Sequence, residues 1–166
     1  MTEVRYAVDS DLPALTEIYN HYVVNTAATF DLEPFTVDSR RAWFDHYRSS
    51  GRHRLLVASQ ADGLLGYASS SRFRVKPAYD PSIEVTVYLH PAATGAGIGS
   101  ALYRRLFEEL SGEDIHRAYA GIALPNDASV ALHRKFGFAE MGTMTEVGRK
   151  FDRWWDVLWM ERSLAS

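Results

Sequence analysis

Apolar residues recur along this chain with two periods, which predict strands and helices in alternation. Alternation with polar residues, or a short apolar run, predicts strands, and these fall at Val4–Val8, Leu55–Ala58, Leu64–Ala68, Ile83–Leu89, Tyr119–Leu124, Ala139–Val147 and Trp154–Met160. Apolar residues three or four apart predict helices, at residues 12–23, from about Thr36 through Trp43, Phe44 and Tyr47, at Gly97–Leu110 and after Asn126. Because a strand hairpin and interspersed helices share the chain, we expect an α/β or α+β sheet with helices on its faces.

Length and charge limit the function classes. The chain has 166 residues, and no repeat or linker-like segment divides it. We therefore expect residues 1–166 to form a single domain. With 46% apolar and 13% aromatic residues, the chain can build a packed core. Its formal charge of −3, with both signs interspersed, provides no basic face for a phosphate backbone, so no nucleic-acid partner is expected.

Three features that the sequence lacks exclude further kinds of site and location. The chain contains no cysteine, which excludes disulfides, thiolate metal sites and a cysteine nucleophile. Five of the six histidines have neither the spacing of metal ligands nor a visible triad partner, so no metal is expected: His21, His46, His53, His90 and His116. We find neither a signal-peptide pattern nor an apolar stretch of about 18 residues, and expect a cytoplasmic protein without membrane contact.

A glycine-rich loop carries the clearest functional signal. The strand Ile83–Leu89 leads to Gly95, Gly97 and Gly99, which open the next helix. Such a loop can direct several backbone N–H groups at one anion, and the helix dipole favours negative charge there. The loop matches neither a Walker loop nor a dinucleotide fingerprint, so a different phosphate-bearing cofactor is implied. Glycines also serve ordinary tight turns, and the loop alone leaves that alternative open.

Further motifs are distributed along the chain. They are Ala27-Ala28-Thr29-Phe30, Lys76-Pro77-Ala78-Tyr79, Glu84-x-x-Val87-Tyr88, Leu124-Pro125-Asn126-x-x-Ser129, Ala131-Leu132-His133-x-x-Phe136-Gly137-Phe138 and Val147-Gly148-x-Lys150-Phe151-x-x-Trp154-x-Asp156. In this order, and together with the glycine loop, they resemble the phosphinothricin and methionine sulfoximine N-acetyltransferases of the GNAT superfamily. The resemblance covers about residues 4 to 162.

The resemblance implies a fold, a reaction and an assembly. The fold is a GNAT-like mixed, mostly antiparallel sheet of about six to seven strands flanked by about four helices. The reaction is acetylation, by acetyl-CoA, of the α-amino group of a small acceptor such as phosphinothricin, methionine sulfoximine or methionine sulfone. The alternatives are a protein N-terminus, lysine or polyamine as the acceptor, or a non-catalytic acyl-CoA sensor. A homodimer is expected, with Trp154, Trp155 and Trp159 in the core and the subunit interface.

The resemblance also assigns the cofactor contacts. Val87, Tyr88 and Leu89 would present backbone groups to the pantetheine arm, and Asn126 would contact the pantetheine or thioester end. The pyrophosphate would be held by main-chain amides of Gly95, Ala96, Gly97, Ile98, Gly99 and Ser100. Thr94 stands where the family pattern has Arg or Gln, so we expect weaker cofactor binding, compensated by Arg104, Arg105 or Arg134.

Glu84 is the predicted general base. Strand periodicity places Glu84, Thr86 and Tyr88 on one face and Ile83 and Val85 on the other, and we expect the face with Glu84 to line the cleft. A partly desolvated carboxylate has a raised pKa, which suits proton removal from an ammonium near neutral pH. The alternative is a glutamate on a solvated strand face.

The remaining candidates are a proton donor and the acceptor contacts. His133 stands where many superfamily members have a tyrosine that protonates the leaving thiolate, and it is either catalytic or a structural hydrogen-bonding residue. The resemblance points to a substrate-binding set of Phe30, Arg74, Lys76, Tyr79, Glu84, Val85 and Thr86. In it, Arg74 and Lys76 would hold the anionic groups of the acceptor. The alternatives are a solvated loop for these two cations and a core position for Phe30.

Overall fold

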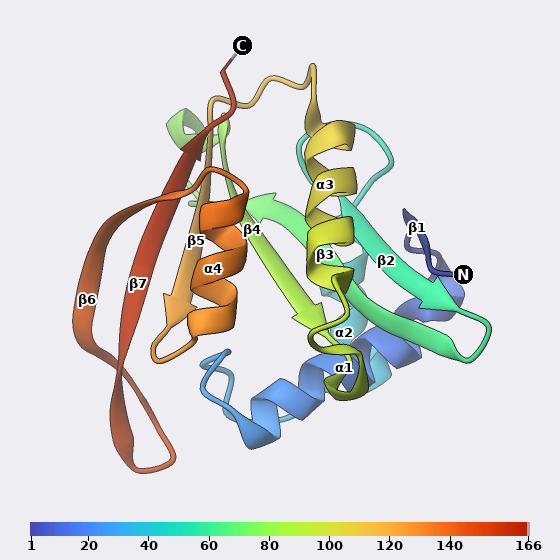
Figure 1. Ribbon diagram of the computed structural model, residues 1–166, viewed down its shortest axis with the longest axis horizontal. Coiled ribbons are helices and arrows are strands. Elements are labelled where there is room, and N and C mark those ends of the chain that lie inside the picture. The colour runs from blue at the N-terminus through green and yellow to red at the C-terminus, as the bar shows by residue number, and fades with distance from the viewer. Residues whose placement is uncertain (166) are drawn as a thin grey trace.

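A seven-stranded sheet runs through the molecule in the computed structural model, which describes residues 1–165 (Figure 1). Its strands are β1 (Glu3–Tyr6), β2 (Leu55–Gln60), β3 (Gly63–Arg72), β4 (Ser82–Leu89), β5 (Arg117–Ala123), β6 (Ala139–Lys150) and β7 (Arg153–Ser163). Their order is β1-β2-β3-β4-β5-β7-β6. Neighbours are antiparallel except β4 and β5, which are parallel. The predicted mixed, mostly antiparallel sheet is thus confirmed.

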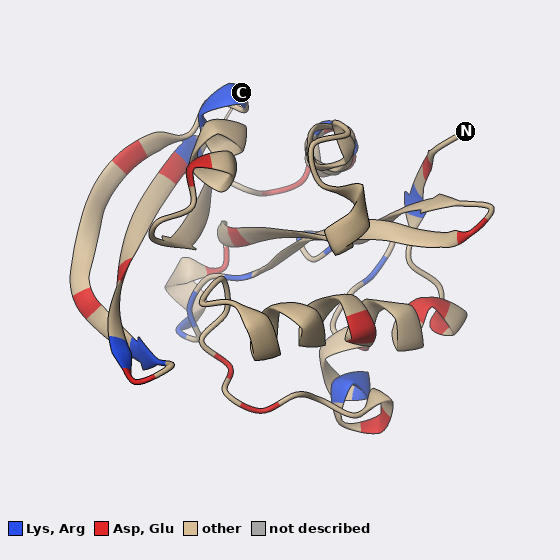
Figure 2. Ribbon diagram, turned by 60° about the horizontal axis from the view of Figure 1, so that its bottom comes forward, with Lys and Arg blue, Asp and Glu red and all other residues tan. Residues whose placement is uncertain are grey.

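Four α-helices cover the two faces of this sheet. They are α1 (Leu12–Asn25), α2 (Val37–Phe44), α3 (Ile98–Leu110) and α4 (Asp127–Lys135). Figure 2 shows α1 and α2 on one face of the sheet and α3 on the other. The caps agree with the sequence signals, because the Thr36 hydroxyl accepts from the amide of Ser39 and the Asn126 side chain accepts from the amide of Ser129.

Two apolar clusters hold the helices on the sheet. On the α3 face, Leu102 and Leu106 are fully buried among residues of β2 to β5. On the α1 face, Leu15 and Ile18 pack against Val57 and other side chains of β2 and β3. Burial of each such side chain stabilises the fold by about 1.5–3 kcal/mol. The sheet is therefore fixed from both sides, and its one parallel strand pair sits between the two helix layers.

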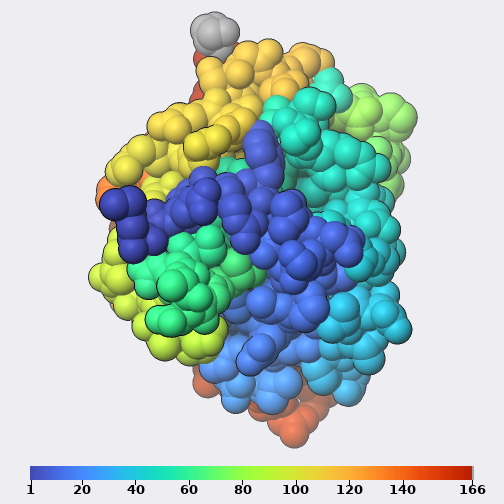
Figure 3. All heavy atoms as spheres, turned by 90° about the vertical axis from the view of Figure 1, so that its right-hand side faces the viewer, coloured from blue at the N-terminus to red at the C-terminus, as the bar shows by residue number. Residues whose placement is uncertain are grey.

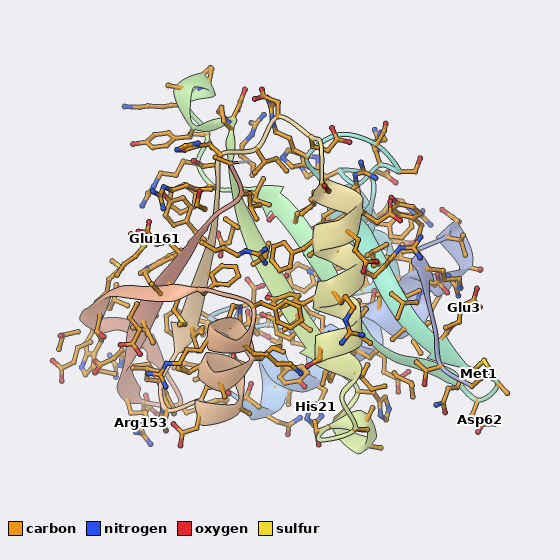
Figure 4. The ribbon with its side chains drawn as sticks, turned by 45° about the horizontal axis from the view of Figure 1, so that its top comes forward. Met1, Glu3, His21, Asp62, Arg153 and Glu161 are labelled. Atoms are coloured by element: carbon orange, nitrogen blue, oxygen red, sulfur yellow. The ribbon has the colours of Figure 1, made fainter. Side chains whose placement is uncertain are left out.

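The C-terminal hairpin differs most from the sequence prediction. Strands β6 and β7 reach beyond the predicted Ala139–Val147 and Trp154–Met160, and their orange-red tip protrudes at the bottom of Figure 3. Figure 4 shows Arg153, at this tip, on the opposite side of the molecule from Asp62, at the turn between β2 and β3. Trp154 was expected in the core and the subunit interface; it is not part of the core of this chain, because it is 56% exposed.

Candidate active site

The parallel pair β4 and β5 separates to form a cleft. The two strands pair only where Ser82–Glu84 faces Arg117–Tyr119, and beyond that point they diverge (Figure 1). Strand β4 stays paired with β3 as far as Leu89 on its other edge, so the backbone over residues 85–89 has a free edge toward the gap. A cleft of about 360 Å³ occupies this gap, as expected for the segment Val87, Tyr88 and Leu89.

The glycine loop forms one end of the cleft. Gly95 and Gly97 have φ of +79° and +77°, a left-handed conformation that disfavours other residues. Gly97 is the N-cap of α3, so the amides of the first turn, from Ile98 through Ser100, have no partner within the helix. A Cβ on Gly99 would lie 3.2 Å from the Leu132 side chain, so α3 and α4 pack closely here. This amide cradle fits a pyrophosphate.

Side chains of the loop add little to this cradle. The Thr94 hydroxyl donates to the carbonyl oxygen of Pro91 at 3.3 Å and supplies no charge. Ala96 is exposed, whereas Ile98 is buried and anchors the start of α3 in the core. The Ser100 hydroxyl accepts a hydrogen bond from Lys135 Nζ at 2.9 Å. The groups that the loop itself offers to an anion are therefore main-chain amides.

Asn126 and His133 line the same cleft from α4. The Asn126 Oδ1 atom is used by the N-cap bond to Ser129. His133 is only 3% exposed; its Nδ1 lies 2.7 Å from the Ser129 carbonyl oxygen and its Nε2 lies 2.9 Å from the Tyr103 hydroxyl. Because a carbonyl oxygen only accepts, Nδ1 carries the proton and Nε2 accepts from Tyr103. Burial lowers the pKa of His133, which favours this neutral form.

A second cavity of about 380 Å³ lies beside the first. Its walls come from the loop after α1, from β4 and β5, and from the β6–β7 hairpin. Five residues line both cavities: Ala28, Thr86, Tyr88, Gly121 and Ala123. The two spaces therefore meet where β4 and β5 diverge. A group held in the cofactor cleft can reach a second molecule across this boundary.

Glu84 is the charged residue among those that line the second cavity. It shares a strand face with Thr86 and Tyr88, as the period of the strand predicted. Within residues 1–165 its carboxylate has no hydrogen-bond partner. Burial raises the pKa of Glu84 above its ordinary value, and the positive charge of Arg74 partly offsets this rise. A half-buried, unpaired carboxylate with a raised pKa is suited to accept a proton.

The other predicted substrate residues are only partly brought together. Phe30 lines the cavity with Glu84 and Thr86. Arg74 acts on Glu84 from the exposed β3–β4 connection, and Lys76 and Tyr79 are exposed there without lining the cavity. The Val85 side chain points the other way, into the core on the cofactor side, because it is one residue out of phase with Glu84 and Thr86.

The second cavity, called the acceptor cavity below after its proposed role, also has a wall that we did not predict. Met144, Val147, Val157 and Trp159 reach it from the β6–β7 hairpin. A Cβ on Gly121 would lie 3.2 Å from the Trp159 ring, so this glycine makes room for the tryptophan. A glycine inside a strand often marks such a close approach, and Gly121 was the available signal.

The hairpin and the loop after α1 interlock. The Phe30 ring lies so close to Gly148 that a Cβ there would be 2.2 Å from the ring. Lys150 Nζ donates to the Thr29 carbonyl oxygen at 2.9 Å. The Tyr19 hydroxyl lies 2.7 Å from the Thr29 hydroxyl and also bonds Asp31. These contacts fix Phe30 at the mouth of the acceptor cavity.

Among residues 1–165, no group of three His, Asp or Glu side chains is arranged to hold a metal ion. No described helix is long and apolar enough to cross a membrane.

Comparisons with known proteins agree with this geometry. The chain matches the family model described as acetyltransferase (GNAT) domain over residues 4–159. It is 56% identical over 164 residues to a phosphinothricin N-acetyltransferase of Streptomyces coelicolor, covering 98% of this chain and 96% of that protein. It is 37% identical over 161 residues to an L-methionine sulfoximine/L-methionine sulfone acetyltransferase of Salmonella typhimurium, covering 97% and 94%.

Solved structures show the same relationship. A GNAT superfamily phosphinothricin acetyltransferase from Sinorhizobium meliloti, in complex with acetyl-CoA, has a TM-score of 0.92 and 34% identity to this chain, covering 99% of this chain and 89% of that one. The matched span includes the diverging strands, the glycine loop and Glu84. The predicted fold and enzyme class are therefore confirmed, and the chain belongs to the GNAT family of acetyltransferases.

Proposed function

We propose that this protein transfers an acetyl group from acetyl-CoA directly to the α-amino group of a small amino-acid-like acceptor. The acceptor would be of the phosphinothricin, methionine sulfoximine or methionine sulfone type, the substrates named for its relatives. The observation that carries the proposal is the junction of the two cavities, with the unpaired Glu84 carboxylate on the acceptor side. Without cysteine, the chain cannot form an acyl-cysteine, which supports direct transfer.

The residues of the chain have distinct tasks in this reaction. Acetyl-CoA, when bound, supplies an acetyl group activated as a thioester. The free edge of β4 offers backbone hydrogen bonds to the pantetheine arm, and the first turn of α3 offers amides to the pyrophosphate. Glu84 removes one proton from the acceptor ammonium, and the neutral nitrogen attacks the thioester carbonyl carbon. The new N–C bond forms as the C–S bond breaks, and the CoA thiolate leaves and takes up the second proton that the nitrogen loses.

His133 has a positioning role in the cleft proposed for the cofactor. Its Nδ1–H and its Nε2 are both engaged, so the ring has no free N–H for a thiolate. Its bond to the Ser129 carbonyl oxygen holds the first turn of α4, and Ser129 lines the cleft in front of the ring. We therefore propose that His133 positions Ser129, whose hydroxyl is 3.4 Å from Nδ1.

The acceptor cavity suits a small amino acid with a bulky neutral or weakly charged side chain. Phe30, Met144, Val147 and Trp159 give it apolar walls. Arg74 stands near Glu84 and can meet the acceptor carboxylate. A cavity of about 380 Å³ accommodates such a molecule more readily than a folded protein segment.

A homodimer and a cytoplasmic location are part of the proposal. Exposed apolar side chains follow the protruding hairpin, namely Met141, Met144, Val147 and Trp154. A second copy that covers this strip would remove it from water and would close the acceptor cavity, to which Met144 and Val147 belong. Light scattering after size-exclusion chromatography tests the dimer, and the monomer mass would contradict it.

The function is tested by thiol release from acetyl-CoA. The acceptor panel contains phosphinothricin, methionine sulfoximine, methionine sulfone, polyamines and peptides. We expect turnover with at least one of the first three and no turnover of peptides. Absence of turnover with every acceptor, despite measurable CoA binding, would reject the enzyme and favour an acyl-CoA sensor.

A further inference from the structure

The cradle for the pyrophosphate lacks a cation of its own. Thr94 is neutral and its hydroxyl is turned to the Pro91 carbonyl oxygen. The loop and first turn of α3, residues 90–103, contain no Lys or Arg, and Figure 2 shows this segment without basic residues. Two negative charges held only by amides and a helix dipole would bind less tightly than with a cation present.

Two of the three arginines that we expected to compensate have carboxylate partners, whereas Arg104 is exposed on α3 and takes part in no ion pair among the described residues. Arg134 forms an ion pair with Glu140, and Arg105 forms one with Glu109 on the next turn of α3. Both pairs are exposed, and each uses a carboxylate that would compete with a phosphate. These two positive charges are therefore already neutralised locally.

Lys135 is a cation from another helix that hydrogen-bonds a residue of the cradle. It is the last residue of α4, yet its Nζ lies 2.9 Å from the hydroxyl of Ser100 in the first turn of α3. This approach depends on the close packing of α3 on α4 at Gly99 and Leu132. In the described part of the chain no ion pair involves Lys135, so its partner is a neutral hydroxyl and two of its three N–H donors remain available.

We propose that Lys135 binds the pyrophosphate of acetyl-CoA and replaces the basic residue that the glycine loop lacks at Thr94. Ser100 orients the ammonium beside the amides of the same helical turn. The assignment rests on the proposed function, because it takes acetyl-CoA as the ligand. The positive charge beside the pyrophosphate would then come from α4 and not from the glycine loop.

The test compares Lys135→Met with Arg134→Met. Both variants remove one positive charge from the last turn of α4 and lose a similar helix-dipole interaction. Calorimetry measures the Kd for CoA, dephospho-CoA and pantetheine, at low and high NaCl. We expect Lys135→Met to raise the Kd for CoA and for dephospho-CoA about tenfold at low salt. Arg134→Met should change neither Kd by more than about twofold.

Three further readouts separate phosphate binding from a structural role. The increase in the Kd for CoA caused by Lys135→Met should be smaller at high salt, because salt screens interactions between charges. Pantetheine, which lacks phosphates, should bind wild type and variant equally. Lys135→Arg, which keeps the positive charge, should restore most of the affinity for CoA.

Each contrary result has a defined meaning. Equal Kd values for CoA in wild type and Lys135→Met would overturn the inference and leave the proposed function intact. A loss seen with CoA but not with dephospho-CoA would overturn it too, because the 3′-phosphate would then be the partner. If wild type binds no CoA, the proposed function itself fails.

Discussion

The cofactor cleft and the acceptor cavity meet at Thr86 and Gly121, but the chain builds them in different ways. The cofactor cleft is mainly a backbone site, made by the free edge of β4 and the left-handed glycines before α3. The acceptor cavity is a side-chain site whose walls come from three separate parts of the chain. A backbone site constrains the sequence through glycines and spacing, whereas a side-chain site can change its lining without changing the fold.

The two regions also differ in how they are fixed. The start of α3 is anchored in the main core by Ile98. The acceptor wall depends on the contact of Phe30 with Gly148 and on the Lys150 bond to Thr29. Substitutions on the cofactor side should therefore change CoA binding, and those on the acceptor side should change acceptor KM. The following variants test this separation.

Replacement of Glu84 should have the largest effect. Glu84→Gln keeps the shape of the side chain but removes the proton acceptor, so kcat/KM should fall by about 10²–10⁴. In wild type the rate should fall as pH drops through the raised pKa of Glu84. The Kd for CoA should not change, and rates equal to those of wild type would remove Glu84 from its role.

The same variant should not lose stability. Because the pKa of Glu84 is higher in the folded state, its contribution to folding is favourable below the ordinary pKa and is lost as the carboxylate ionises. At neutral pH, Glu84→Gln should therefore have a Tm equal to or above that of wild type. A lower Tm would indicate that the carboxylate has a stabilising partner.

Replacement of Gly97 should affect the cofactor side alone. A valine there must adopt a left-handed conformation, which costs roughly 1–2 kcal/mol or more and displaces the amides of the cradle. We expect Gly97→Val to raise the Kd for CoA about tenfold, measured by calorimetry. Gly142→Ala is the control, because its Cβ has open space and its backbone is not left-handed.

Replacement of Gly148 should affect the acceptor side alone. In Gly148→Ala the new Cβ displaces the Phe30 ring, so acceptor KM should rise several-fold while the Kd for CoA stays constant. Because the new alanine at Gly148 acts through the Phe30 ring, the double variant Gly148→Ala with Phe30→Ala should have the same acceptor KM as Phe30→Ala alone. Additive losses would show that Gly148 has another role.

The smallest effect concerns His133 and pH. Burial lowers the pKa of His133, so its contribution to stability is present above the ordinary pKa of about 6.5 and is lost as pH falls through the lower, folded value. We expect the stability advantage of wild type over His133→Gln to shrink as pH decreases, by at most about 1.4 kcal/mol per pH unit. Chemical denaturation at several pH values measures it, and a constant difference would contradict a neutral buried ring.

The local signals of the sequence predicted much of the fold and of the cofactor side. The capping residues Thr36 and Asn126 stand where helices begin, and the strand period correctly placed Glu84, Thr86 and Tyr88 on one face. Helix caps, strand alternation and glycine turns depend on neighbours a few residues away, so they can be read from the chain.

Contacts between distant residues could not be read in the same way. Trp159 lines the acceptor cavity and Trp154 is exposed on the same strand, and the sequence did not distinguish these two positions. Two of the expected compensating arginines, Arg105 and Arg134, pair with nearby carboxylates, whereas Lys135 reaches from α4 to Ser100 on α3. No periodicity or short motif in the sequence indicates any of these contacts.

The sequence by itself therefore determined the elements, the family and a glycine loop suited to an anion, since each follows from local spacing or from motifs in order. Only the tertiary structure decided how far β4 and β5 stay paired, that the two cavities join, and that the β6–β7 hairpin lines the second cavity. The physical reason is that these features arise from the packing of residues up to about 120 positions apart, such as Thr29 and Lys150. Their proximity is fixed by the whole core and not by any one segment.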